Sequence, residues 1–419
     1  MKSDILATLT RKSGDKPKVD GDGPGWDMPL LVVVMMLVSL GLVMLYSASS
    51  VIAAQRMGEH YVLLSGQAER ALLGVFGMLV ALQIDYRWYK RLVYPILGVT
   101  IALLVLVAIP GIGVVHNGAR RWLNVVGFGF QPAEVAKLAA VIFLAYSISK
   151  KGKRMGSFTI GFLPHLFIVG ALVGLLMLQP DFGTSVMLIG VMMLLLFVSG
   201  AKLSYLFLIT MGGAVAGYFA ISGSEYRTQR ILAFLDPWSH RSDIGYQISE
   251  SLIAIGSAGL GGRGLGQGAG KLGYVPELWN DFIGTIIAEE LGILGIVFVV
   301  GLFLVLLWRG FRIAFGATDS FGMYLAFGLT SLFALQAVMN LFVVTGMLPT
   351  KGLTLPFVSF GGTSIIVGLY SVGILLNISR NEPDYWGEER ESREARKQEK
   401  RWEKKRKKIL SRRDDLRHH

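Results

Sequence analysis

Apolar runs of about twenty residues recur along the whole chain, and they constrain its fold more than any other feature. A helix of that length crosses a hydrocarbon core of about 30 Å. The runs lie at residues 28–46, 64–84, 93–111, 133–149, 159–178, 183–200, 203–222, 283–307, 320–345 and 363–379. The sequence therefore predicts an all-α polytopic membrane protein with about ten transmembrane helices.

The composition agrees with a membrane protein. Hydrophobic residues make up 53% of the 419 residues and charged residues only 17%, against roughly 25% charged in soluble domains, and the mean hydropathy is +0.53. The 52 glycines suit close packing of transmembrane helices. The chain has no cysteine, which excludes disulfides, thiolate catalysis and thiol metal sites.

Positive charges predict the topology. The net charge of +12 is concentrated near the ends, which favours a membrane-topology interpretation over nucleic-acid binding. The basic clusters are Arg11, Lys12, Lys16, Lys18, Arg87, Lys90, Arg91, Lys150, Lys151, Lys153, Arg154, Arg309 and Arg312. They predict that both termini are cytoplasmic. We expect a tail at 1–27 leading into an uncleaved anchor, one membrane domain at 28–379, and a basic tail at 380–419 that contacts membrane lipids.

Three segments are then expected to face outward, at 114–131, 222–280 and 348–362. They carry the cations Arg120, Arg121, Arg227, Arg230, Arg241, Arg263, Lys271 and Lys351. Cations are uncommon in short loops on that side, so as a group they indicate a phosphate-bearing ligand. The alternative is that single arginines pair with lipid phosphates or with Asp236 and Asp243.

The first outward segment places Asn117, Arg120, Arg121 and Trp122 close together. A guanidinium offers a rigid fork that matches phosphate oxygens, which makes the two arginines candidates for ligand contact. Trp122 suits the membrane interface, or alternatively the face of a sugar.

Two further groups of polar residues have structural alternatives. Glu134 and Lys137 are three residues apart and share one helical face. They form either a self-neutralising pair or, through Lys137, a substrate contact. Asp181, in the sequence QPDFGT, is expected to cap the helix that follows it.

Within the stretch 261–292 a glycine-rich loop ends with a lone carboxylate, Asp281, on the threshold of the eighth apolar run. An ionisable group at the membrane boundary is a functional candidate by default. Gln247 and the glycines lie just ahead of it, and glycines let backbone amides approach a phosphate. A carboxylate among cations suits deprotonation of a hydroxyl while a diphosphate leaves. The rival carboxylates are Glu277, Glu289 and Glu290, of which the last two lie deeper in the helix and are candidates for a structural role.

Other kinds of site do not fit the sequence. Gly270-Lys271 is followed by Leu272 and not by the serine or threonine that a Walker A motif needs. No strand precedes the glycines, as a dinucleotide fingerprint requires. The histidines expected to face outward, His60, His116 and His240, have no serine in a nucleophile-elbow context. Metal-ligand spacing is also absent from the sequence.

Several long motifs, taken in order, resemble the SEDS family, the FtsW/RodA group of bacterial membrane glycosyltransferases. They are LVMLYSASS at 42–50, NGARRW at 117–122, QPAEVAKL at 131–138, QPDFGTS at 179–185, GYQISESLIAIGSAGLGGRGLG from Gly245, PELWNDFIGTIIAEELG, and LPTKGLTLPFVSFGGTS. The match spans nearly the whole chain. Two departures, DFIG for DFIF and SFGGTS for SYGGSS, do not touch Asp281.

The resemblance implies ten helices in the bacterial cytoplasmic membrane and polymerisation of lipid II, an undecaprenyl-diphosphate-linked disaccharide pentapeptide, on the outer face. It implies that Asp281 is the general base on the acceptor sugar 4-hydroxyl, in an inverting transfer that makes β-1,4-linked glycan. The expected substrate contacts are Arg120, Arg121, Lys137, Arg263, Lys271 and Lys351, supported by Asn117, Glu134, Gln247 and Glu277.

The sequence TKGLTLP at 350–356 looks like the cell-division branch of the family. The resemblance then implies a class B penicillin-binding transpeptidase (FtsI-like) as partner, together with other divisome proteins and no nucleic acid. A lipid II flippase and a non-enzymatic divisome scaffold stay as alternatives. The sequence also leaves open whether Mg²⁺ or Mn²⁺ assists the diphosphate.

Overall fold

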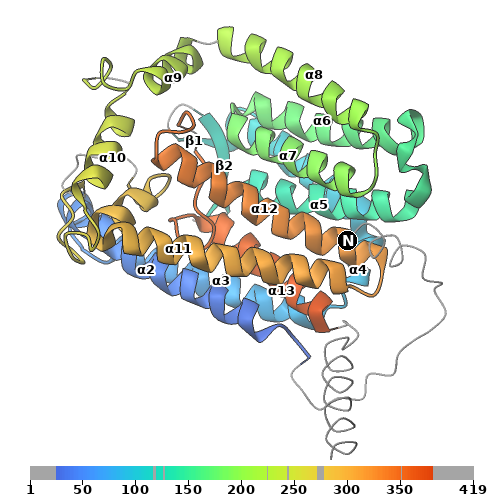
Figure 1. Ribbon diagram of the computed structural model, residues 1–419, viewed down its shortest axis with the longest axis horizontal. Helices are drawn as coiled ribbons and strands as arrows, with labels where there is room; N and C mark the ends of the chain where they lie inside the picture. Colours follow the sequence, from blue (N-terminus) through green and yellow to red (C-terminus); the bar gives the residue numbers. More distant parts are fainter. Residues whose placement is uncertain are drawn as a thin grey trace, which may run out of the picture. The chain divides into compact units, whose positions relative to one another are not determined.

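The computed structural model describes residues 25–116, 119–125, 128–223, 225–242, 245–270, 278–350 and 352–380. Within them ten helices coincide with the ten predicted apolar runs (Figure 1). They are α2 (Met28–Met57), α3 (Val62–Gln83), α4 (Arg87–Ala108), α5 (Pro132–Lys151), α6 (Leu163–Leu178), α7 (Phe182–Val198), α8 (Leu203–Ser222), α11 (Ile283–Gly316), α12 (Ser320–Val344) and α13 (Gly362–Arg380). All but a few residues of the two predicted tails lie outside the described residues.

The described helices confirm a helical membrane protein. Eight of them are long and apolar enough to cross a membrane, while Phe182–Val198 and Leu203–Phe219 form shorter apolar helices. Two further helices, α9 (Glu225–Leu235) and α10 (Tyr246–Ser257), lie in the long segment between α8 and α11. A 3₁₀ turn (Gly152–Gly156) and a π turn (Phe158–Phe162) join α5 to α6.

Aspartates fix the starts of several helices. Asp27 Oδ1 accepts from the Leu30 amide at 2.9 Å, and Asp319 Oδ1 caps α12 in the same way. Asp181 Oδ1 accepts from the Thr184 amide at 3.2 Å, and its Oδ2 accepts from the Thr184 hydroxyl at 2.9 Å. Such caps satisfy amide groups that a helix start leaves without partners. The predicted capping role of Asp181 is confirmed.

Helices α5 and α12 form the centre of the bundle. Of an 18-residue stretch in each of their spans, 78% and 67% of the residues are buried, against 67% for α13 and 22% for α3. Helix α12 packs against α5, α7 and α11, and α3 packs against α13, as Figure 1 shows for α12. Polar side chains on α5 and α12 are therefore removed from lipid and must find partners inside the protein.

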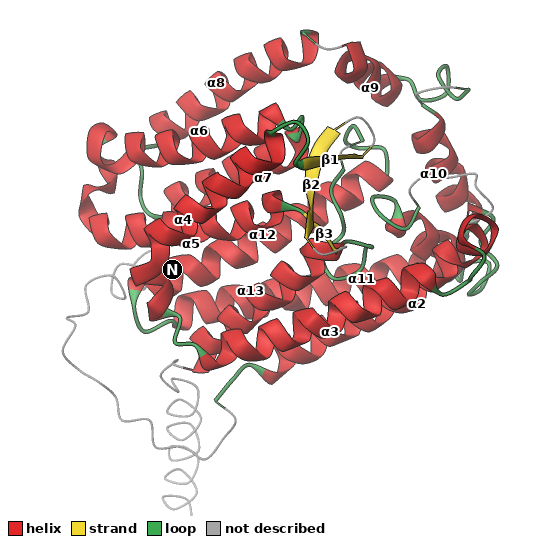
Figure 2. Cartoon of the chain, turned by 180° about the vertical axis from the view of Figure 1, so that it is seen from behind, coloured by secondary structure: helices red, strands yellow, loops and turns green. Residues whose placement is uncertain are grey.

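A small antiparallel sheet, drawn yellow in Figure 2, adds to the predicted all-α fold. Strands β1 (Gly113–His116), β2 (Ala119–Val125) and β3 (Phe128–Phe130) lie in the order β1-β2-β3. Trp122 pairs with Val114, and Leu123 with Phe130. The described part of the segment predicted as an outward loop thus forms strands that satisfy one another's backbone groups.

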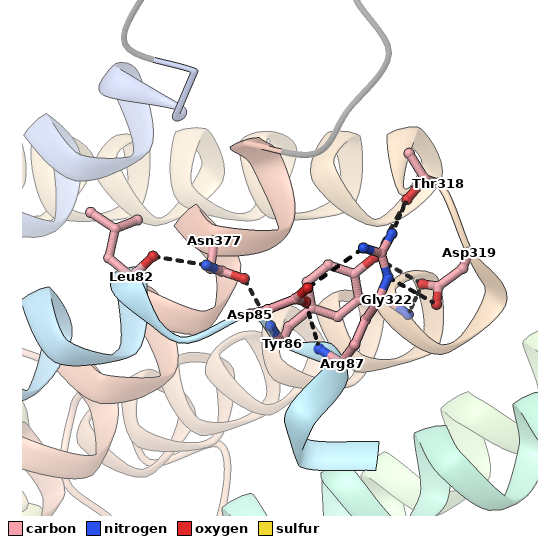
Figure 3. Close-up of polar contacts among 8 residues, drawn as sticks. All are labelled: Leu82, Asp85, Tyr86, Arg87, Thr318, Asp319, Gly322 and Asn377. Carbon is pink, nitrogen blue, oxygen red and sulfur yellow. Dashed lines mark hydrogen bonds and ion pairs between the residues drawn. The ribbon is translucent and has the colours of Figure 1, made fainter. Parts of the chain in front are cut away.

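Polar ties join several elements at one end of the bundle (Figure 3). Asn377 Nδ2 donates to the Leu82 carbonyl at 2.8 Å, and the Tyr86 amide donates to Asn377 Oδ1 at 2.9 Å. The Tyr86 hydroxyl donates to Asp319 Oδ1 at 3.0 Å. These bonds hold the turn between α3 and α4 against α13 and the start of α12. At the same end Arg309 pairs with Asp27.

Candidate functional site

A cavity of about 510 Å³ opens beside the start of α11, at the opposite end of that helix from the Tyr86 ties. This volume lies within the range of about 300–1,000 Å³ that is usual for ligand sites. Its polar lining is Arg121, Trp122, Asn124, Gln131, Glu134, Thr184, Asn280, Asp281, Gln336, Thr354 and Ser364. The Asp281 carboxylate and the Arg121 guanidinium, from different segments, therefore share this cavity with a second carboxylate, Glu134.

The segments predicted to face outward meet around this cavity. Strand β2 supplies Arg121, the turn before α11 supplies Asp281, and the segment before α13 supplies Gly352. Glu134 comes from the first turn of α5. Arg121 and Asp281 were predicted as functional residues, and the fold brings these two together.

Asp281 lies two residues before α11. The N-cap of this helix is Phe282, whose side chain makes no capping hydrogen bond. The Asp281 backbone carbonyl accepts from Asn340 Nδ2 at 2.9 Å. A methyl group added at Gly352 would lie 3.7 Å from Asp281 Oδ2 and 3.8 Å from Arg121 Nη1. The carboxylate and the guanidinium therefore flank the same glycine.

Arg121 is held by two backbone carbonyls. Its Nε donates to Gln179 O at 3.1 Å and its Nη2 to Pro180 O at 2.6 Å. These bonds fix the guanidinium plane and leave Nη1 beside Gly352. Its neighbour Arg120 does not line the cavity. Arg120 pairs with Val115 and Trp122 with Val114, so Arg121 is the extra residue of a register shift in β2.

Glu134 and Lys137 form a buried ion pair. Lys137 Nζ lies 2.8 Å from Glu134 Oε2, and both side chains are almost fully buried. Lys137 Nζ also donates to Gln336 Oε1 at 3.3 Å. The predicted pairing on one helical face is confirmed. Glu134 lines the main cavity, whereas Lys137 lines a smaller one behind it.

The glycine-rich loop contacts carboxylates of α11 in place of a ligand phosphate. The Ala269 and Gly270 amides donate to Glu289 at 2.8 and 3.1 Å, and the Gly268 amide donates to Glu290 at 3.2 Å. The expectation that these amides approach a phosphate is therefore wrong at these three positions. The structural role considered for Glu289 and Glu290 is confirmed.

Arg263 lies in the same loop and outside the cavity lining. Its Nη1 is 3.2 Å from Glu289 Oε1, and its Nη2 donates to the Ser257 hydroxyl at 2.8 Å. Because Glu289 is only 1% exposed, this ion pair compensates a buried charge. A substrate contact by Arg263 stays a prediction, to which the described geometry adds no support.

Helix α11 is broken at Gly292, where φ is 69° and ψ is −165°. The Arg263 and Gly264 amides donate to the carbonyls of Glu289 and Glu290 at 2.9 and 3.0 Å. The Ile293 amide and its successor donate back to the loop at Gly259 and Leu260. The loop thus satisfies backbone groups that the break would leave unpaired. The part after the break, 293–316, is about 36 Å long and suffices to cross a bilayer.

The remaining predicted residues are not seen in the cavity. Asn117, Lys271, Glu277 and Lys351 lie outside the described residues. Gln247, in the first turn of α10, is half-buried and does not line the cavity. These assignments stay predictions.

Two buried amides on α12 were missed. Gln336 and Asn340 are 4% and 1% exposed, and Gln336 lines the cavity. The available signal was an amide side chain inside an apolar run, which is costly in a membrane unless it has partners.

The chemistry of the cavity suits a polar, anionic ligand. A carboxylate can accept a proton, the guanidinium can bind a phosphate, and Trp122 can lie against a sugar ring. Among the residues that the structure describes, no group of three histidine, aspartate or glutamate side chains is arranged to hold a metal ion.

The fold and the cavity together define a polytopic helical membrane protein with a polar ligand site at one end of its bundle. The sequence matches the FtsW/RodA/SpoVE family, described as "Cell cycle protein", over residues 28–384. The chain belongs to this family, and the predicted membership is confirmed.

Similar proteins cover most of the chain. A "Probable peptidoglycan glycosyltransferase FtsW" from Trichlorobacter lovleyi is 45% identical over 354 residues, covering 84% of this chain and 93% of the relative. "Stage V sporulation protein E" from Bacillus subtilis is 41% identical, covering 84% and 97%.

Solved structures share the fold. A chain described under "Structural coordination of polymerization and crosslinking by a peptidoglycan synthase complex" matches with a TM-score of 0.71 and 29% identity, covering 85% of this chain and 98% of that one. The rod shape determining protein RodA of Thermus thermophilus matches with a TM-score of 0.64 and 28% identity, covering 85% and 97%.

Proposed function

We propose that this chain is a peptidoglycan glycosyltransferase of the membrane that polymerises lipid II into β-1,4-linked glycan strands. Its relatives carry the name of that activity, and a chain of a peptidoglycan synthase complex shares its fold. The observation that carries the proposal is the placement of Asp281 and Arg121 beside Gly352 in one cavity. A proton acceptor and a phosphate-binding group then act on the same substrate pair.

In the proposed reaction Asp281 takes the proton of the acceptor sugar 4-hydroxyl. The hydroxyl oxygen forms a bond to the donor C1 as the bond from C1 to the diphosphate breaks. Undecaprenyl diphosphate leaves with the electron pair, and its negative charge is stabilised by Arg121. A single displacement inverts the configuration at C1 and needs no covalent enzyme intermediate.

Membrane orientation follows the same proposal. Arg87, Lys150 and Arg309 lie on elements at the end of the bundle away from the cavity. The positive-inside rule assigns that end to the cytoplasm and the cavity to the outer face. Polymerisation would therefore take place outside the cytoplasmic membrane, where the product strand is needed.

We assign the activity to septal wall synthesis, with a class B penicillin-binding transpeptidase and other divisome proteins as partners. The support is the FtsW name of several relatives and a structural neighbour described as coordinating polymerization and crosslinking. The partner would crosslink the strands that this chain makes.

The test is polymerisation of lipid II by the purified chain together with its cognate transpeptidase in liposomes. Asp281→Asn, at matched folding and complex formation, should lose polymer. Asp236→Asn is the control, because Asp236 is an exposed outward aspartate that hydrogen-bonds its own turn at Ser239. It should retain activity.

Other outcomes would contradict the proposal. Equal polymer from wild type and Asp281→Asn would refute the assignment of the base. No polymer from a competent wild-type complex would favour a lipid II flippase or a divisome scaffold. Repeating the assay after chelation, and with Mg²⁺ or Mn²⁺ restored, measures whether a divalent cation assists the diphosphate.

A further inference from the structure

One buried amide joins the backbone of Asp281 to the opposite wall of the cavity. Asn340 Nδ2 donates to Asp281 O at 2.9 Å and to Leu353 O at 2.7 Å. The first carbonyl precedes α11 and the second precedes α13. Leu353 follows Gly352, the residue beside both the Asp281 carboxylate and the Arg121 guanidinium.

The orientation of this amide follows from its surroundings. In the reverse orientation the Asn340 Oδ1 atom would face two carbonyl oxygens, which is repulsive. In the observed orientation Oδ1 is buried and has no partner among the described residues. An unpaired buried acceptor destabilises the fold, whereas a leucine would add no unpaired polar atom. The two hydrogen bonds that Nδ2 donates therefore explain why this position is an asparagine.

A second amide one turn earlier acts on the same wall. Gln336 Nε2 donates to Thr354 O at 2.9 Å, and Gln336 Oε1 accepts from Lys137. Residues four apart lie on one helical face, so one face of α12 holds the 353–354 backbone at two successive carbonyls. Only Asn340 also reaches the Asp281 backbone.

Resting on the proposed function, we infer that Asn340 is a positioning residue for the reaction. It fixes the Asp281 peptide relative to Gly352 and thereby sets where the carboxylate meets the acceptor hydroxyl. It does not touch the substrate cavity itself. A displacement of about 1 Å in a reacting group can lower a rate on the order of 10²-fold. Loss of this anchor should therefore lower kcat and change KM little.

The variant Asn340→Asp keeps the side-chain shape but replaces the donor to the two carbonyls. We expect kcat for lipid II polymerisation, per folded complex, to fall at least about tenfold, with KM changed by less than about twofold. The matched control is Asn377→Asp. Asn377 is also a buried helical asparagine, with Nδ2 donating to Leu82 O, but it lies at the other end of the bundle (Figure 3). It should lower thermal stability and leave kcat unchanged.

A second measurement does not use activity. The chain has no cysteine, so Asp281→Cys with Gly352→Cys introduces the only thiols, at two positions where a Cβ built on residue 352 lies 3.7 Å from the Asp281 Oδ2 atom. Oxidation should form the disulfide when residue 340 is asparagine, and the yield of disulfide should fall in the Asn340→Asp background. The Asn377→Asp background should behave like the Asn340 protein.

The results separate this inference from the proposed function. If wild type polymerises and Asp281→Asn does not, full kcat in Asn340→Asp overturns the positioning role alone. Equal loss of kcat in Asn340→Asp and Asn377→Asp also overturns it, because the effect would then be general destabilisation. If Asn340→Asp does not fold, Asn340→Gln, which shifts the amide by one methylene, must show the same fall in kcat. A competent wild-type complex that makes no polymer overturns both statements.

Discussion

Arg121 and Asp281 both approach the same glycine, Gly352, in the cavity lining. A methyl group built on that glycine would lie 3.8 Å from Arg121 Nη1 and 3.7 Å from Asp281 Oδ2, at ordinary van der Waals distances. Glycine at this position therefore adds no side chain to the part of the cavity that lies beside a phosphate-binding group and a proton acceptor. That space is where the reacting oxygen atoms of the proposed mechanism must meet.

Substitutions at Gly352 should show how much of this space the substrate uses. Gly352→Ala fits without a clash, so polymerisation should be kept within about twofold of wild type, whereas Gly352→Leu should lower kcat/KM at least about tenfold by blocking the site. Gly98→Leu is the control, because Gly98 is exposed on α4 with nothing within 4 Å of an added methyl group. Full activity of Gly352→Leu in the lipid II assay would show that the substrate does not occupy the space beside Gly352.

Arg121→Lys tests the guanidinium fork. A lysine cannot hold the carbonyls of Gln179 and Pro180 together and still face Gly352. We expect the KM for lipid II to rise about tenfold, which corresponds to about 1.4 kcal/mol of binding. Arg120→Lys is the matched control on the same strand, outside the cavity lining. An equal rise of KM in both variants would argue against a specific role for Arg121.

The helices could be predicted from the sequence because each apolar run is local, and length with hydropathy suffices to find it. Asp281 could be singled out for the same reason, as an acid at the end of such a run. The break at Gly292 could not be predicted, since the run 283–307 contains no proline and the backbone partners come from the loop at 259–264. Tertiary hydrogen bonds decide that feature.

The candidate site also contains features that the sequence alone could not predict. Arg121 and Arg120 are adjacent and chemically identical in the sequence, yet Arg121 lines the cavity at a register shift of β2 and Arg120 pairs with Val115 outside the lining. The glycine-rich loop suggested phosphate binding by composition, but Glu289 and Glu290 of α11 occupy three of its amides. The sequence does not reveal which of several polar groups will pair.

Gly262 should tolerate no side chain. It has a φ of +75°, and an added methyl group would lie 2.2 Å from the Glu290 carbonyl oxygen at the break in α11. Left-handed backbone alone costs a non-glycine residue about 1–2 kcal/mol, and the clash adds to that. Gly262→Ala should therefore lower the melting temperature in detergent by several degrees.

Gly261→Ala is the matched control, because its added methyl group meets nothing within 4 Å and its φ is not positive. It should melt like wild type. Equal melting temperatures for both variants, measured by intrinsic fluorescence, would contradict the tight docking of the loop into the helix break.

Tyr86 makes the free energy of unfolding depend on pH in the alkaline range. Burial raises the pKa of Tyr86 to about 12, from an ordinary value of 10. Between these values the unfolded chain has lost the phenolic proton while the folded chain still holds it. The contribution is therefore fully present below pH 10 and is lost as pH rises towards 12, at about 1.4 kcal/mol per pH unit.

Tyr86→Phe should remove this part of the pH dependence. The variant loses the bond from the hydroxyl to Asp319, so it should be less stable than wild type at neutral pH. As pH rises from about 10 to about 12 the difference should shrink, since only the wild type must keep a proton that the unfolded state has released. Tyr218→Phe, at an exposed tyrosine, controls for loss of a hydroxyl. If the melting temperatures of wild type and Tyr86→Phe fell equally over this pH range, the tie between α3, α4 and α12 would not depend on this proton.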